Sequence, residues 1–459
     1  MVFSTQDVLL FTAGLIGFEL LIFALLLTRR KIFHWLSAGF WAWSAFMLYY
    51  VVAPISAVIS GNLVPFHIRL QLGGGVSRGF WVALVISVGI FVFFLIYMRT
   101  SLPMVDLGIR HKTPLVTPFF FYWLIVFCGF GLYSLLASRS GLTSWQGERI
   151  IESGRFVGDV TGYQSGGYGL LFFPILLLLL WPNRLSRVVG LMLAIVFIVL
   201  SLPHAWSRYV TISMLLALSM WHVTNNKNKW PNIIVLLSLV LVTLIYQARG
   251  HTQWSFSGIP QAVDESLKEV TNKGVGALAE SDTQMLATFW IESAWHDDWI
   301  GHDYGLRFLN YFLTGWIPSR YMPQKYFLVD WLSAKRPPYP ITFDRLLYGA
   351  KSSLIGSFYA NGNIVAVVLQ MALMGWFSRK VDGMVQSETP IAIRALGISW
   401  LSTLWMVWGS HDYWGLMLLG TMAIPFLIGF PVFHFKGRAL SLERSTKTNY
   451  KAKVFDVRS

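Results

Sequence analysis

The strongest constraint on the fold of this chain is a series of long stretches without a single charged residue. Examples are residues 170–180, 191–202 and 233–245. A helix needs about 17–25 mainly apolar residues to cross the hydrocarbon of a bilayer. The 459-residue chain is 55% hydrophobic and only 13% charged, too little charge to cover the surface of a soluble protein. We therefore predict an all-α polytopic membrane protein.

The apolar runs and the polar breaks between them predict about eleven transmembrane helices. We place these near residues 8–28, 34–57, 79–98, 115–137, 167–182, 188–203, 209–223, 232–247, 356–377, 392–408 and 413–434. The first apolar run, Val8–Leu27, is longer than the apolar core of a signal peptide, and its basic cluster Arg29–Lys31 follows the run instead of preceding it. We therefore expect this segment to stay in the mature protein as a membrane anchor. The predicted organisation is helices 1–8 in residues 1–247, a large polar loop in 248–355, helices 9–11 in 356–435 and a basic tail in 436–459.

The net charge of +14 lies mostly on one predicted side of the membrane. The basic residues there fall within residues 29–31, 99–112, 184–187, 227–229, 379–394 and 436–458. This interpretation puts Arg379, Lys380 and Asp382 in a connection after the helix near 356–377. Because cytoplasmic loops carry the excess of Lys and Arg, we predict an outer amino terminus, an inner carboxyl terminus and an outer 248–355 loop. The charge thus orients the protein and indicates no nucleic acid partner.

The 248–355 loop is expected to carry the function. Its first half includes a candidate amphipathic helix at Val263–Val270, and its second half is dense in aromatic residues and prolines. Tyr and Trp favour the headgroup layer of a membrane, and aromatic faces also stack on sugar rings. Long loops without low-complexity character are usually functional. We expect this loop to lie over a site at the membrane surface.

Three arginines on the outer side are candidate phosphate ligands. Arg208 begins a span, Arg249 directly follows the end of the next one, and Arg320 ends the segment Trp316–Arg320 in the loop. Guanidinium groups match phosphate oxygens bidentately and keep their charge. The alternative is that they anchor the protein to ordinary phospholipid headgroups. For Arg208 and Arg249 we favour a diphosphate, because the outer side otherwise avoids an excess of positive charge.

Histidines and carboxylates on the same side could supply a general base. The candidates are His251, His296, His302, His411, Glu292, Asp297, Asp298, Asp303 and Asp412. We favour His411-Asp412, which lies on a short turn between two predicted helices, with His302-Asp303 on the loop as a further pair.

No metal or other cofactor is predicted. The adjacent His and Asp residues lack a convincing ligand spacing, and the single cysteine, Cys128, rules out a Cys-based metal site. The triplet Gly73–Gly75 lacks the Lys-Ser/Thr ending of a phosphate loop. Glu19 is the only carboxylate expected within a span, where it is functional, paired or facing water.

Four segments together resemble the Wzy-type O-antigen or oligosaccharide repeat-unit polymerases. They are Trp206-Ser207-Arg208, Gln247-Ala248-Arg249-Gly250, Trp316-Ile317-Pro318-Ser319-Arg320 with Pro323 and Lys325, and Ser353–Gly362 at the re-entry into the membrane. The resemblance covers roughly the C-terminal two-thirds of the chain. Many relatives have a glutamate before the Phe-Tyr of the re-entry motif, whereas Ser357 stands here, which argues against a catalytic role for that position.

The resemblance implies a C-type glycosyltransferase fold and a polymerase that uses no nucleotide sugar. It would pass a glycan from undecaprenyl diphosphate to a lipid-linked repeat unit at the periplasmic face of a bacterial inner membrane. Arg208, Arg249 and Arg320 would hold the diphosphate, and His411 or Asp412 would activate the acceptor hydroxyl. The candidate substrate contacts are His251, His302, Asp303, Trp316 and Tyr359. Membrane lipid is an expected partner, and a chain-length regulator and a flippase are further candidates.

Other functions remain open at this stage. An O-antigen ligase uses the same donor but transfers the glycan to lipid A core. A flippase or exporter of lipid-linked sugar should carry charged residues within several spans, and here only Glu19 qualifies. A secondary transporter often shows inverted repeats, and the sequence contains no such repeat. A structural interaction protein would not need arginines at three helix ends.

Overall fold

The computed structural model describes the main helical segments and a few residues between them. The described residues are 4–59, 75–102, 118–139, 151–152, 155–156, 162–201, 207–248, 353–386, 389–409, 416 and 418–429, with single positions between 264 and 305. Within them the regular secondary structure is helical except for two short antiparallel strands, β1 (Ile151–Glu152) and β2 (Arg155–Phe156).

The helices follow the apolar runs of the sequence. They are α1 (Thr5–Arg29), α2 (Ala38–Met47), α3 (Ala53–Ile59), α4 (Gly75–Arg99), α5 (Pro118–Arg139), α6 (Gly162–Leu180), α7 (Arg184–Ser201), α8 (Ser207–Asn225), α9 (Ile233–Ala248), α15 (Ser353–Val385) and α16 (Ile391–Gly409), followed by an apolar helix over Leu418–Gly429. A π-helical turn, η1 (Leu48–Val52), joins α2 to α3.

Five of the described helical segments are long and apolar enough to cross a membrane. They are Thr5–Arg29, Ala38–Ser56, Val76–Arg99, Leu354–Val385 and Ile391–Trp408. This finding supports the predicted polytopic helical membrane protein. The total of about eleven spans stays a prediction.

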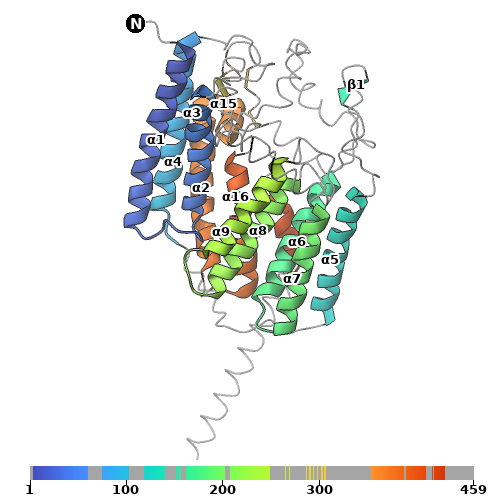
Figure 1. Cartoon of the computed structure of the whole chain (residues 1–459). Coiled ribbons are helices and arrows are strands. Elements are labelled where there is room, and N and C mark those ends of the chain that lie inside the picture. Colours follow the sequence, from blue (N-terminus) through green and yellow to red (C-terminus); the bar gives the residue numbers. More distant parts are fainter. Residues whose placement is uncertain are drawn as a thin grey trace, which may run out of the picture.

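The helices form a bundle with two ends, which we call the upper and lower faces (Figure 1). At the lower face, the backbone N–H of Trp35 donates to the carbonyl of Lys229 at 3.2 Å, and Arg30 donates to the carbonyl of Met98. These contacts bring together the α1–α2 connection, the α8–α9 connection and the end of α4. The beginnings of α1, α4 and α8 and the end of α9 therefore lie at the upper face.

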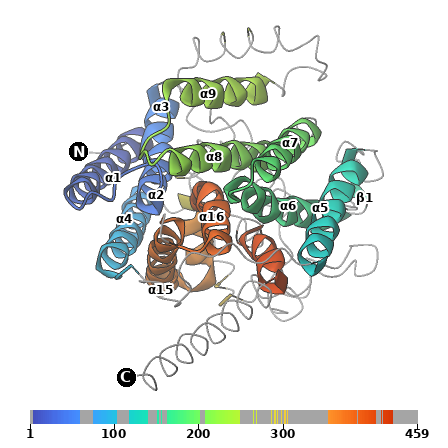
Figure 2. The ribbon, with the colours of Figure 1, turned by 90° about the horizontal axis from the view of Figure 1, so that it is seen from below.

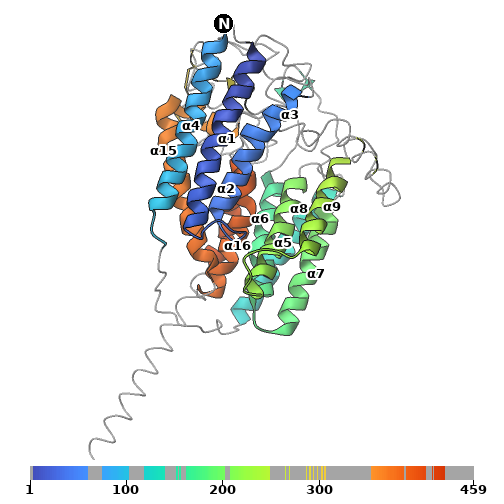
Figure 3. The ribbon, with the colours of Figure 1, turned by 60° about the vertical axis from the view of Figure 1, so that its left-hand side comes forward.

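Helix α16 connects two groups of helices. Figure 3 shows α1, α2, α4 and α15 on one side and α5–α9 on the other. Seen from below, α16 lies between them, and it contacts α2, α15, α6 and α8 (Figure 2). Its buried side chains include Leu401, Leu404 and Trp408. The bundle is thus built around α16.

Helices α4 and α15 pack closely because small residues lie between them. A Cβ atom placed on Gly375 would overlap the backbone carbonyl of Phe93, and one placed on Gly89 would lie 3.0 Å from Val367. Small residues allow such close approach of helix backbones in membranes. This contact holds the part of α15 after Asn363 against the lower half of α4.

The prediction that Glu19 is the only carboxylate within a span is wrong. Helix α15 continues to Val385 and carries Asp382, which is 8% exposed. The Asp382 carboxylate accepts hydrogen bonds from the Tyr97 hydroxyl, from Arg379 Nη1 at 3.3 Å and from the backbone N–H of Ala38 at 2.7 Å. An anion is favourable at the start of a helix such as α2. The prediction from hydropathy ended this helix near residue 377. It was too short because the polar side chains beyond that point form hydrogen bonds with one another inside the bundle.

Candidate functional site

A group of polar side chains connects the large loop to the upper ends of α4 and α15. We call Arg78, Trp81, Asp297, His302 and Tyr359 the upper cluster. Arg78 forms an ion pair with Oδ2 of Asp297, and the Tyr359 hydroxyl donates to the same oxygen at 2.7 Å. Trp81 Nε1 donates to the Tyr359 hydroxyl at 2.9 Å. Three distant segments of the chain thus meet at one carboxylate.

His302 bridges Asp297 and Tyr359. Its Nδ1 lies 3.0 Å from the Tyr359 carbonyl oxygen, which can only accept, so Nδ1 carries the hydrogen in this contact. Its Nε2 lies 3.4 Å from Oδ1 of Asp297, a distance at which protonated imidazole forms an ion pair. The imidazole therefore joins the loop to the backbone of α15 and also contacts Asp297 within the loop.

A break in α15 explains why the Tyr359 carbonyl can accept this bond. The backbone leaves the helical conformation at Gly362 and at Asn363, where φ is 61°. In a continuous helix the Tyr359 carbonyl would pair with the N–H of Asn363, four residues later. The helix then resumes, with the Asn363 side-chain oxygen accepting from the N–H of Ile364 at 2.6 Å. Asn tolerates a positive φ better than most residues.

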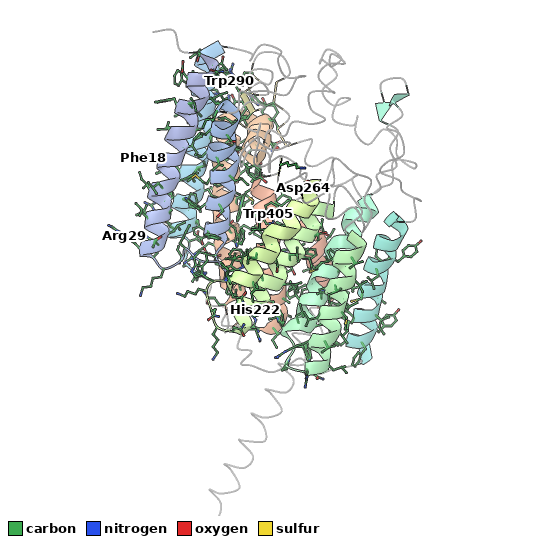
Figure 4. All side chains as sticks on the ribbon, viewed as in Figure 1. Phe18, Arg29, His222, Asp264, Trp290 and Trp405 are labelled. Atoms are coloured by element: carbon green, nitrogen blue, oxygen red, sulfur yellow. The ribbon has the colours of Figure 1, made fainter. Side chains whose placement is uncertain are left out.

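Apolar residues of the loop hold the upper cluster against the bundle. Phe289 and Trp290 are 1% and 2% exposed. The Phe289 ring meets the Tyr359 ring edge-on at a centroid distance of 5.4 Å. The Trp290 ring fills the space beside Gly79 on α4, where any Cβ atom would overlap it. Figure 4 shows Trp290 at the upper face and Arg29 at the lower.

The upper cluster combines burial with access from outside. The side chains of Arg78, Asp297 and His302 are 17%, 20% and 15% exposed. At this depth their interactions are stronger than those of surface pairs. A carboxylate, an imidazole and a phenol in mutual contact can bind hydroxyl groups and exchange protons with them. Among the described residues, no group of three or more His, Cys, Asp or Glu side chains is arranged to hold a metal ion.

The structure brings together two of the residues predicted from sequence, His302 and Tyr359. Arg208 is the second residue of α8, and α9 ends at Ala248, one residue before Arg249. Both helix ends lie at the upper face, and α8 packs against α9. The Arg208 side chain and the predicted residues Arg249, His251, Asp303, Trp316, Arg320, His411 and Asp412 lie outside the described part of the chain.

Sequence reasoning gave no role to Arg78 or Trp81. One signal was available: the two residues are three positions apart at the start of an apolar helix, which puts them on the same side of that helix. Asp297 was considered, but only as one of several carboxylates. Asp297 and Arg78 are 219 positions apart in the sequence, so no local sequence pattern can indicate that they pair.

No family model, curated protein or solved structure matches this chain. A functional assignment therefore has to rest on the sequence motifs and on the geometry of the upper cluster.

Proposed function

We propose that this protein polymerises oligosaccharide repeat units carried on undecaprenyl diphosphate. The product would be O-antigen or another surface polysaccharide. The main support is the upper cluster, which joins the Ser353–Gly362 segment to the large loop through Tyr359 and His302. This is the segment that resembles the re-entry motif of Wzy-type polymerases.

The charge distribution supports a periplasmic location for the upper face. The basic residues Arg29, Arg30 and Lys229 belong to segments at the lower face, where positive-inside bias predicts the cytoplasm. The proposal therefore includes an outer amino terminus, an inner carboxyl terminus and a bacterial inner membrane. It also includes the C-type glycosyltransferase fold that the resemblance implies.

The proposed donor site uses the arginines. Arg208 is the second residue of α8 and Arg249 follows the last residue of α9 in the sequence, and α8 and α9 are neighbours whose start and end lie at the upper face. Together with Arg320 they would hold the donor diphosphate. As the bond between the anomeric carbon and the phosphate breaks, negative charge develops on the departing diphosphate, and guanidinium groups stabilise that charge.

The proposed acceptor step uses His411 or Asp412. Helix α15 reaches the lower face at Asp382, and α16 returns and ends at Gly409, two residues before His411. One of these groups would take the proton of the acceptor hydroxyl. The hydroxyl oxygen would then form a bond to the anomeric carbon, with undecaprenyl diphosphate as the leaving group. His251, His302, Asp303, Trp316 and Tyr359 would contact the sugars.

The proposal can be tested in the source bacterium by deleting the gene and restoring it on a plasmid. Deletion should leave single repeat units on the lipid carrier, detected by mass spectrometry of lipid extracts, and remove long polysaccharide from gels. Arg208→Ala and Arg249→Ala should reproduce the deletion at normal protein levels, and Lys should restore little. The control is Arg184→Ala, an exposed arginine at the start of α7 on the lower face. Normal polysaccharide ladders from the Arg208 and Arg249 variants would refute the diphosphate site.

The same experiment separates the alternative functions. Loss of a ligase would leave long polymer on the lipid carrier. Loss of a flippase would leave single repeat units that remain on the cytoplasmic side, where added periplasmic glycosidase cannot reach them. Partners such as a chain-length regulator or a flippase would be sought by purification of the intact protein from its own membrane.

A further inference from the structure

A tight turn in the large loop carries an exposed tyrosine in a strained backbone conformation. Gly301, Tyr304 and Gly305 have φ values of 73°, 50° and 80°. Positive φ is easy for glycine but uncommon for tyrosine. The Tyr304 side chain is nevertheless 79% exposed. Such strain persists only where the surroundings impose it, and it is concentrated at functional sites.

His302 attaches the turn to the bundle. His302 holds it to Tyr359 and Asp297 of the upper cluster. Tyr304 Cδ1 lies 4.0 Å from the position that a Cβ atom of Gly362 would occupy, at the break in α15. Cβ atoms placed on Gly301 or Gly305 would meet nothing within 4 Å. The exposed Tyr304 ring thus lies two residues along the chain from the His302 imidazole, which contacts the Asp297 carboxylate.

The ring also lies near the upper end of an apolar side of α15. Beyond the break, α15 exposes a line of large apolar side chains: Val365, Leu369, Leu373 and Trp376, which are 46–66% exposed. Their spacing of three or four residues puts them on one side of the helix. We infer that this side faces lipid and that its upper end, just after Gly362, lies toward the headgroup layer. A sugar attached to a lipid carrier travels at this level.

We propose that Tyr304 is a stacking platform for a sugar ring of the lipid-linked substrate, next to Asp297 and His302 as partners for its hydroxyl groups. This inference rests on the proposed polymerase function. Pyranose rings have apolar C–H faces and polar edges, which match an exposed aromatic ring beside hydrogen-bonding groups. A tyrosine that merely anchors the protein among phospholipid headgroups needs neither a left-handed backbone nor attachment to a carboxylate–imidazole pair.

Replacement by glycine distinguishes a binding role from a structural one. Tyr304→Gly removes the ring and also relieves the backbone strain, so thermal stability should stay equal or rise. Substrate binding should weaken at the same time. Tyr304→Phe keeps the stacking surface and should bind normally. Tyr133→Ala serves as the control, because it removes a ring that is 67% exposed on α5, away from the upper cluster.

The assay uses the purified full-length protein in lipid nanodiscs, with lipid-linked repeat units extracted from the deletion strain as substrate. For Tyr304→Gly we expect a KM about three- to tenfold higher, the range expected for one aromatic contact. KM should change less than about twofold for Tyr304→Phe and for the control. An unchanged KM for Tyr304→Gly overturns the inference. The inference also fails if Tyr304→Gly changes only the binding of the protein to vesicles that contain phospholipid alone. If the wild-type protein forms no polymer, the proposed function itself fails.

Discussion

The ion pair between Arg78 and Asp297 should hold the large loop on the helix bundle, and a double-mutant cycle can measure its contribution. The side chains are 17% and 20% exposed, and Asp297 also accepts a hydrogen bond from Tyr359. Exposed pairs contribute about 0.2–1 kcal/mol, whereas loss of one partner of a buried pair costs about 3–5 kcal/mol. The intermediate burial here predicts about 2 kcal/mol for either Arg78→Ala or Asp297→Ala.

The double variant should lose less stability than the sum of the two single variants. After the first substitution the remaining charge has already lost its partner, so removing it costs little more. We expect a coupling energy of about 1–2 kcal/mol. Unfolding of the purified protein in mixed micelles of dodecyl sulfate and a mild detergent gives the free energies for the cycle.

A second pair in the same loop provides the matched control. Lys268 and Asp264 lie 2.6 Å apart, but their side chains are 69% and 60% exposed. Their coupling energy should be about 0.3–0.5 kcal/mol, as for other pairs four residues apart on a helix. If the Arg78–Asp297 coupling is no larger than this control, the ion pair does not hold the loop and our reasoning is refuted.

Three further predictions concern the bundle itself. Tyr97→Phe removes the buried hydroxyl that donates to Asp382 and should cost about 2–4 kcal/mol of unfolding free energy, measured in the same micelles. Gly375→Ala places a methyl group against the Phe93 carbonyl and should cost about 1–3 kcal/mol, whereas Gly129→Ala, with no atom within 4 Å of the added Cβ, should not destabilise. Burial lowers the pKa of His34 from 6.5 to about 4, and the positive charges of Lys229 and Arg379 contribute to this shift. The unfolded chain therefore takes up this proton at a higher pH than the folded protein, so stability is full above about pH 6.5 and falls as the pH drops toward 4. His34→Gln should make melting temperatures less dependent on pH in this range.

The sequence alone located most of the described apolar helices closely. Whether an apolar run is long enough to cross the hydrocarbon of a bilayer can be read from consecutive residues in the sequence. The observed helices Thr5–Arg29 and Ile233–Ala248 accordingly differ from the predicted ranges by at most a few residues. The prediction failed at the end of α15, where Asp382 is stabilised by partners from other parts of the chain.

The candidate site depended on the tertiary structure to a much greater extent. The sequence identified His302, Tyr359 and Asp297 as separate candidates, because their residue types and predicted location suit hydroxyl and proton chemistry. It could not pair Asp297 with Arg78, 219 positions away. Arg78 on α4 and Tyr359 on α15 both reach the Asp297 carboxylate of the loop, and they do so only in the packed bundle. Hydropathy acts through the solvation of contiguous residues, whereas the partners of a polar side chain are decided only when the helices have packed.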